Sequence, residues 1–242
     1  MKPLARWTIG PTCQIGRDIL KESVRLFAKA YPEFDRVVCY NHVEQPQLSN
    51  VDFYPQSEDE APCPLARPDS DPESATGCGW KLSPPRLRPG SHELFIDNDI
   101  VIRQRLPAID SWLSDGESGL VSEGLHRQRM FGAFDGHIPP HVRACAGLFG
   151  LPPGFDFSER IRHYWPLMLG KPLGGYNEQG LTVATVVNMS RYVLVPLEEL
   201  FICEDHATFP QIIPPALHFV AANRKPWHRG WMHYKSQMIG LL

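Results

Sequence analysis

The 242-residue sequence lacks several features that define special classes of protein. It has no apolar run near the ~20 residues that a membrane-spanning helix requires, and its first residues lack the apolar core of a secretory signal. Its net charge of −3 provides no overall positive field for attracting nucleic acid. None of its six cysteines forms a C-x-x-C pair, which argues against a zinc ribbon or a dense disulfide framework. We therefore expect a soluble, cytoplasmic protein that does not bind nucleic acid.

Internal repeats are also absent, and the composition is that of an ordinary globular protein, with 43% hydrophobic and 21% charged residues. This length suits one sizeable core, so we expect a single domain over residues 1–242. Apolar patterning predicts a strand at 5–9, a helix at 17–31 and a second strand at 35–41. This order indicates a Rossmann-like α/β fold with a mixed, mainly parallel sheet flanked by helices.

Proline, by contrast, is plentiful between Glu44 and Gly90, which hold nine prolines and two runs of acidic residues. Such a composition does not form a packed core of its own, so we expect a flexible insert. Both a tolerated surface insertion and a functional mobile loop fit this composition. Later in the chain the pattern predicts further elements: a strand at 92–102, helices at 107–113 and 177–189, and strands at 192–196 and 200–203.

Two carboxylates follow the apolar run Leu94–Ile96, in the sequence Asp97-Asn98-Asp99. If the backbone is extended there, both carboxylates point to the same side. Burying two negative charges is costly without a cation, and Mg²⁺ or Mn²⁺ prefers carboxylate oxygens. A D-x-D sequence also occurs by chance at strand ends that face water. We favour a divalent metal site formed by Asp97 and Asp99.

A second group of polar residues follows a short apolar stretch near the end of the chain. His218 lies there, and Lys225-Pro226-Trp227 follows seven residues later. An imidazole nitrogen can join carboxylates around one metal ion, and a lysine ammonium suits a phosphate oxygen. A lone histidine is more often structural, but together with the earlier D-x-D sequence His218 becomes a candidate metal ligand.

In this order, these features resemble nucleotide-sugar glycosyltransferases of the GT-A fold, and most of all glycosyltransferase family 8. The likeness rests on the opening strand–helix–strand, the D-x-D strand and the late His–Lys-Pro-Trp segment. The chain departs from the family between His218 and Lys225, where it lacks the usual glycine and is one residue longer. We therefore do not carry over the family's retaining stereochemistry.

The resemblance implies a role for each matching residue. Asp97, Asp99 and His218 would hold Mn²⁺ or Mg²⁺ against the diphosphate of a nucleotide-sugar donor, a UDP-sugar in the first place. Lys225 would neutralise the leaving nucleoside diphosphate and thereby contribute to catalysis. The remaining donor-binding candidates are Thr8, Gly10, Tyr40, Asn41, Lys81, Asn98 and Gly147.

On the acceptor side, the resemblance makes Glu178 a candidate for the catalytic base or for orienting the acceptor. A glutamate in the first turn of a helix is equally explained by helix electrostatics. Lys81 likewise has two explanations, a donor-binding residue or an ordinary solvated loop lysine. Glu123 and the group Glu204, Asp205 and His206 are further acidic candidates without a distinct role.

The resulting hypothesis is a metal-dependent glycosyltransferase whose acceptor is an unknown sugar, lipid or protein. Two alternatives stay open. One is a nucleotidyltransferase that makes a sugar nucleotide, although no glycine-rich phosphate loop follows the first strand. The other is a non-catalytic nucleotide-binding module that keeps the GT-A fold.

Overall fold

The structure is a computed structural model of the chain. It describes residues 1–41, 43–60, 78–125, 131–168, 175–203, 209–210, 212–220 and 228–239. Lys225 and the group from Glu204 to His206 lie outside the described residues, as does the middle of the proline-rich segment. Among the described helices, none is both long enough and apolar enough to cross a bilayer.

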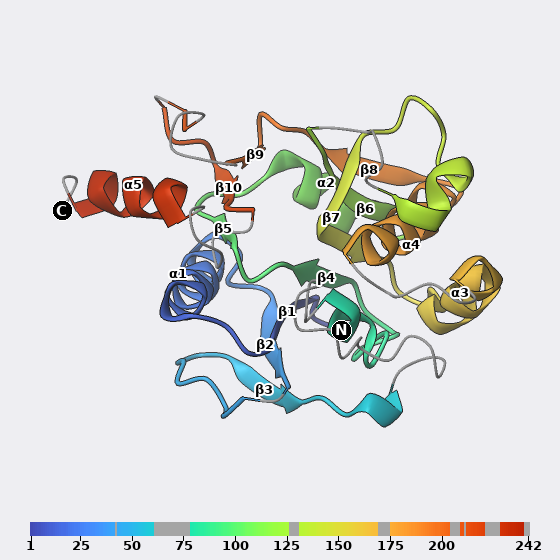
Figure 1. Ribbon diagram of the computed structural model, residues 1–242, viewed down its shortest axis with the longest axis horizontal. Helices are drawn as coiled ribbons and strands as arrows, with labels where there is room; N and C mark the ends of the chain where they lie inside the picture. Colours follow the sequence, from blue (N-terminus) through green and yellow to red (C-terminus); the bar gives the residue numbers. More distant parts are fainter. Residues whose placement is uncertain are drawn as a thin grey trace.

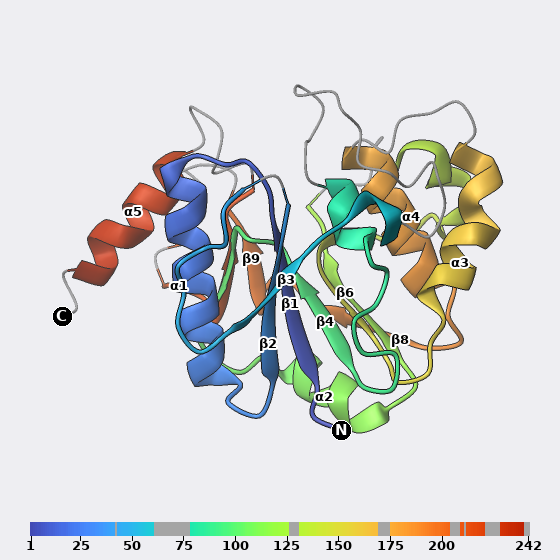
Figure 2. The ribbon, with the colours of Figure 1, turned by 90° about the horizontal axis from the view of Figure 1, so that it is seen from below.

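A seven-stranded sheet forms the centre of the fold (Figures 1 and 2). Its strands follow the order β3-β2-β1-β4-β7-β6-β8. Only β7 runs antiparallel to its neighbours, β4 and β6, and the other pairs are parallel. The mixed, mainly parallel sheet predicted from the sequence is therefore confirmed. The strands are β1 (Leu4–Ile9), β2 (Asp35–Tyr40), β3 (Asp52–Pro55), β4 (Glu93–Ile96), β6 (Gly119–Glu123), β7 (Ala144–Leu151) and β8 (Tyr192–Val195).

A second, three-stranded sheet joins parts of the chain that are far apart in sequence. It consists of β5 (Ile100–Ile102), β10 (Ala216–His218) and β9 (Leu200–Ile202), in that order. The central strand β10 runs antiparallel to β5 and parallel to β9. The C-terminal part of the chain is thereby brought next to the residues that follow β4.

Helices cover both faces of the large sheet (Figure 2). One face packs against α1 and the other against α3 and α4, while α5 lies beside α1. The α-helices are α1 (Gln14–Ala30), α2 (Pro107–Asp115), α3 (Phe157–Tyr164), α4 (Gly175–Val187) and α5 (His228–Ile239). Short 3₁₀ turns are η1 (Glu58–Glu60), η2 (Cys78–Leu82), η3 (Gly132–His137) and η4 (Trp165–Met168).

The apolar spacing of α1 explains its position. Leu20, Val24 and Phe27 recur every three to four residues and are buried against the sheet. The Phe27 ring packs edge-on against Trp7 of β1, with ring centroids 5.4 Å apart. The predicted opening of strand, helix and strand is therefore confirmed as β1, α1 and β2. The later predictions correspond to α2, α4, β8 and β9, with ends that differ by at most two residues.

The strand predicted over 92–102 is wrong as one continuous element. The chain turns after β4, with the Ile100 amide donating to the Asp97 carbonyl at 3.0 Å, and β5 then enters the small sheet. Asp and Asn favour such turns because their short polar side chains compete with regular backbone pairing. Asp97 and Asp99 therefore flank a turn between two sheets instead of sharing one face of a strand.

The described parts of the proline-rich segment contain regular secondary structure and buried side chains. Residues 52–55 form β3, which pairs with β2 as an edge strand of the large sheet. Trp80, Leu82 and Ser83, at its other end, are buried. In these parts, pairing with β2 and tertiary packing override the composition, while the flexibility of the 44–90 insert stays a prediction.

Candidate metal and donor site

The turn that follows β4 meets the last residue of β10. In the small sheet, His218 pairs with Ile100, and the Phe219 amide donates to the Asp99 carbonyl at 2.9 Å. Backbone pairing thus fixes His218 beside Asp99, although 119 positions separate them in the sequence. The sequence-based grouping of these two residues agrees with their placement.

Asp97, Asp99 and His218 form the one group of potential metal ligands found among the described residues. Their ligand atoms all lie within 4.8 Å of one another. His218 Nε2 lies 3.3 Å from Asp99 Oδ1, and that buried oxygen accepts no aligned hydrogen bond. Two carboxylates and one imidazole suit Mn²⁺ or Mg²⁺, and an unsatisfied buried carboxylate oxygen gains from a cation. The residues present therefore fit a divalent ion.

Gly147 of β7 supports this cluster directly. Its carbonyl accepts a hydrogen bond from the Asp97 amide at 2.8 Å. A Cβ atom at this position would lie 2.5 Å from Cε1 of His218, so the imidazole occupies the space that any side chain would need. Glycine is required here because the ring approaches the backbone so closely. Its expected contact with a donor sugar is a separate prediction.

Lys81 connects the metal cluster to Glu178. Its Nζ lies 2.5 Å from Asp97 Oδ1 and 3.6 Å from Glu178 Oε1, and it donates to the Ala146 carbonyl at 3.4 Å. The Lys81 side chain is only 14% exposed, so it is not a solvated loop lysine. The described end of the proline-rich segment therefore brings a cation to the predicted metal ligands.

Glu178 lies in the first turn of α4 and is almost fully buried. The start of α4 is held close to η3, where the Ala133 amide donates to Asn177 Oδ1 at 2.9 Å. Gly180 packs against the Phe131 carbonyl so tightly that a side chain there would collide with it. This packing directs Glu178 toward Lys81 and away from water.

Burial changes the acid–base properties of this group. It raises the pKa of Glu178 to about 7, with Lys81 opposing the shift and Asp97 adding to it. It also raises the pKa of Asp97, against the influence of Lys81 and together with that of Asp99. Glu178 can therefore take up or release a proton near neutral pH, which an ordinary exposed glutamate cannot.

For the pKa of His218, the neighbouring side chains outweigh burial. Burial alone would lower the pKa of His218, but Asp99 and the Cys145 side chain together raise it well above its ordinary value. Before an ion is bound, the protonated imidazole neutralises part of the charge on Asp99. Cys145 was not predicted as a site residue, because nothing in the sequence around it indicates contact with His218.

The residues predicted to bind the nucleoside gather at the ends of β1 and β2. Thr8 lies in β1 and Tyr40 in β2, while Gly10 and Asn41 follow these strands. The backbone amide of Asn41 donates to the Ile9 carbonyl at 3.1 Å. The side-chain Oδ1 of Asn41 would lie 2.8 Å from a Cβ atom placed on Gly10. These residues are therefore neighbours, as parallel strands require.

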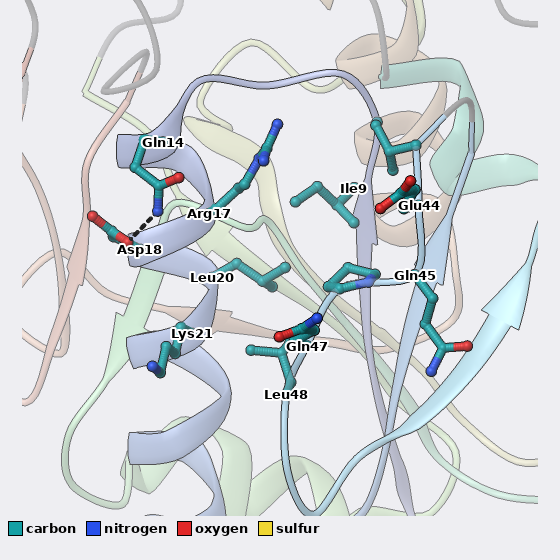
Figure 3. A pocket seen from close by; sticks show the side chains of 13 residues that line it. Ile9, Gln14, Arg17, Asp18, Leu20, Lys21, Glu44, Gln45, Gln47 and Leu48 are labelled. Atoms are coloured by element: carbon teal, nitrogen blue, oxygen red, sulfur yellow. Dashed lines mark hydrogen bonds between the residues drawn. The ribbon is translucent and has the colours of Figure 1, made fainter.

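A cavity of about 580 Å³ opens beside Gly10, between α1 and residues 43–48 (Figure 3). Leu20 and Ile9 provide apolar lining, and Arg17 reaches in from α1. Of the predicted site residues, only Gly10 lines this cavity. It is thus separate from the cluster of Asp97, Asp99 and His218.

Two other candidate residues, Asn98 and Glu123, also lie among the described residues. Asn98 is half-buried in the turn between Asp97 and Asp99. Glu123 Oε2 accepts a hydrogen bond from the Leu197 amide at 3.0 Å, which gives this acid a structural contact. Sequence reasoning missed Gln56, which contacts the turn that holds Lys81; its polar surroundings in the sequence give no signal of that contact.

Among the comparisons with known proteins, only those with solved structures find similar proteins, and these share one fold. No protein-family model matches the sequence, and no curated protein matches it closely enough to count as a relative. Among solved structures, the galactosyltransferase LgtC, in complex with donor and acceptor sugar analogs, is similar with a TM-score of 0.62 and 11% identity. That match covers 99% of this chain and 96% of LgtC.

Two further structures agree with this result. The bifunctional glycosyltransferase WbbM has a TM-score of 0.57 and 13% identity, over 98% of this chain and 52% of WbbM. The glycosyltransferase GlyE of Streptococcus pneumoniae has a TM-score of 0.56 and 11% identity, over 96% of this chain and 60% of GlyE. The chain has the GT-A fold, as the resemblance implied.

Proposed function

We propose that this GT-A chain is a metal-dependent glycosyltransferase that moves a sugar from a nucleotide-sugar donor to an acceptor. The observation that supports the proposal best is the cluster of Asp97, Asp99 and His218 at the carboxyl end of β4. In open α/β sheets, ligands bind outside the carboxyl ends of the strands. The fold and the cluster therefore agree on the location and on the chemistry.

Asp97, Asp99 and His218 would hold Mn²⁺ or Mg²⁺. When bound, such an ion neutralises the charge that grows on the departing diphosphate. The residues' own contribution is to fix the position of the donor phosphates relative to the strand ends. A UDP-sugar is the donor that we propose first, with Thr8, Gly10, Tyr40 and Asn41 at the nucleoside end.

Lys81 and Glu178 suit the chemistry around the transferred sugar. Lys81 lies within ion-pair distance of both Asp97 and Glu178, so its ammonium can contact a donor phosphate oxygen beside the metal. Glu178, with a pKa of about 7, can orient an acceptor hydroxyl and take up its proton. We assign Lys225 to the leaving diphosphate on the resemblance alone, and Asn98 and Gly147 to the donor sugar.

The proposal is tested by thermal melting of the protein with UDP, with and without Mn²⁺. A ligand that binds only the folded state must raise the melting temperature. We expect UDP to do so only when Mn²⁺ is present, and Asp99→Ala to abolish the effect. UDP-sugar turnover, followed by UDP release, then separates an enzyme from a non-catalytic nucleotide-binding module. If neither UDP nor another nucleoside diphosphate stabilises the protein with Mn²⁺, the proposed function is wrong.

A further inference from the structure

The 3₁₀ turn η2, which holds Lys81, is contacted by a side chain from the far edge of the large sheet. Gln56 follows β3, and its backbone amide donates to the Tyr40 carbonyl at 2.9 Å, which extends the pairing of β2 with β3. Its backbone is therefore fixed by the sheet. Its side chain reaches from there to the backbone on both sides of Lys81.

The Gln56 carboxamide makes three hydrogen bonds. Its Nε2 donates to the Trp80 carbonyl at 2.6 Å and to the Ser83 carbonyl at 2.5 Å. Carbonyl oxygens only accept hydrogen bonds, so this end of the carboxamide must be the NH₂ group. Its Oε1 then faces Asn41, whose Nδ2 donates to it at 3.0 Å. Hydrogen-bond chemistry thus fixes the orientation of both amides.

These contacts link the two predicted ends of the donor site. Asn41 Oδ1 lies against Gly10 at the end of β1, and Gln56 connects Asn41 to the turn of Lys81. Lys81 in turn reaches Asp97 and Glu178. Gln56 therefore connects Asn41, beside Gly10, with the backbone on both sides of Lys81.

We propose that Gln56 is a positioning residue that holds the Lys81 ammonium against Asp97. Gln56 acts on Lys81 through the backbone, because its hydrogen bonds go to the Trp80 and Ser83 carbonyls on either side of Lys81. That Lys81 then serves a donor phosphate rests on the proposed function. The positioning itself rests only on the hydrogen bonds described above.

Arg6 also contacts this turn, donating to the Pro84 carbonyl at 2.7 Å. It is less suitable for a test because it is fully buried and paired with buried Glu93. Replacing it would leave an unpaired buried carboxylate and destabilise the whole chain. Gln56 is neutral and half-buried, so its loss removes the hydrogen bonds without leaving a charge.

The experiment measures the reactivity of Lys81 in the metal-free protein. An N-hydroxysuccinimide acetyl ester transfers its acetyl group to a neutral lysine amine, and the extent at each lysine is read by mass spectrometry. Lys2, whose side chain is 71% exposed, is the internal reference. We expect Gln56→Leu to raise the acetylation rate of Lys81 relative to Lys2 by at least about threefold, because a released side chain becomes accessible and loses its ion pair.

Two further variants keep the test decisive. Gln56→Glu has nearly the same shape but cannot donate to the two carbonyls, so it should also release Lys81. Gln237→Leu on α5 is the matched control, because the Gln237 side chain pairs with His233 of its own helix, and it should leave Lys81 unchanged. An unchanged rate in a folded Gln56→Leu or Gln56→Glu protein would overturn the proposal.

A second measurement separates positioning from a general structural effect. Calorimetry with Mn²⁺ alone compares Gln56→Leu, Lys81→Met and the double variant. Removing a cation beside Asp97 should raise Mn²⁺ affinity severalfold in each, and the double variant should match Lys81→Met. Additive effects would show that Gln56 does not act through Lys81. If the native chain binds no Mn²⁺ but Gln56→Leu still exposes Lys81, the proposed function fails and the positioning stands.

Discussion

The candidate metal cluster of Asp97, Asp99 and His218 lies beside the Lys81 turn, yet the two are held in place by different kinds of contact. His218 and Asp99 are fixed by backbone pairing in the small sheet, and Asp97 by its amide bond to the Gly147 carbonyl. The turn of Lys81 is held by side chains, namely Gln56 and Arg6. Backbone pairing tolerates substitution of most residues, whereas a contact made by one side chain is lost with that residue.

This difference indicates how each region responds to change. The metal ligands should keep their geometry under most substitutions outside the cluster, apart from those at Gly147. Lys81 should be displaced by a single change at the far edge of the sheet. Three substitutions test the contrast, from the largest expected effect to the smallest, and the pH dependence of metal binding then sharpens it.

The largest effect is expected from Glu93→Gln, which removes the central charge of the side-chain network next to the Lys81 turn. Glu93 is fully buried, pairs with Arg6 and Arg86 at 3.5 Å, and accepts hydrogen bonds from the Leu87 and Arg88 amides. Removing its charge leaves two buried guanidinium groups without their partner. We expect a loss of about 3–5 kcal/mol in the free energy of unfolding, measured by urea denaturation.

The control for this variant is Glu33→Gln, which removes an exposed ion pair with Arg105. Exposed pairs contribute less than about 1 kcal/mol. If the two variants were destabilised equally, Glu93 would not be the organising charge of this region.

The second effect concerns the metal cluster itself. Asp99→Ala removes one of three ligands while the Phe219 amide can still donate to the backbone carbonyl of residue 99. We expect Mn²⁺ affinity to fall at least about 100-fold in calorimetry, since loss even of a residue that only supports a ligand costs 10–100-fold. Chemical unfolding should show a fold that stays intact. Unchanged affinity would exclude Asp99 from the site.

The third effect tests the support beneath the ligands. Gly147→Ala places a methyl group where the His218 ring lies, so the imidazole must move. We expect Mn²⁺ affinity to fall about tenfold, as for residues that orient a metal ligand. Gly136→Ala is the control, because a Cβ atom there meets nothing within 4 Å. Equal affinity in the two variants would mean that the ring position is unimportant.

The last and most gradual effect is the pH dependence of metal binding. The metal-free protein has a raised pKa for His218, and an ion binds only the neutral imidazole. As the pH falls below the pKa of His218, Mn²⁺ affinity should decrease by up to about tenfold per pH unit, because one proton must leave the imidazole when the ion binds. Proton release measured by calorimetry in two buffers checks this. An affinity independent of pH from 5 to 8 would contradict ligation by His218.

The amino-acid sequence by itself determined most of the local elements and pointed to the residues of the candidate site. The spacing of Leu20, Val24 and Phe27 determines α1, because burying one face of a helix needs only this periodicity. Asp97 and Asp99 were chosen as candidates because two carboxylates directly after an apolar strand are costly to bury without a cation. His218 became a candidate because an imidazole can share a metal ion with carboxylates, and the resemblance to family 8 added to that reasoning.

Only the tertiary structure decided how these residues meet. The break between β4 and β5 depends on which neighbours each strand finds, and those neighbours, β7 and β10, lie far away in the sequence. The same holds for Gly147 under His218 and for Gln56 beside the Lys81 turn. Local sequence contains no signal of such contacts, because they form between segments that only the folded chain brings together.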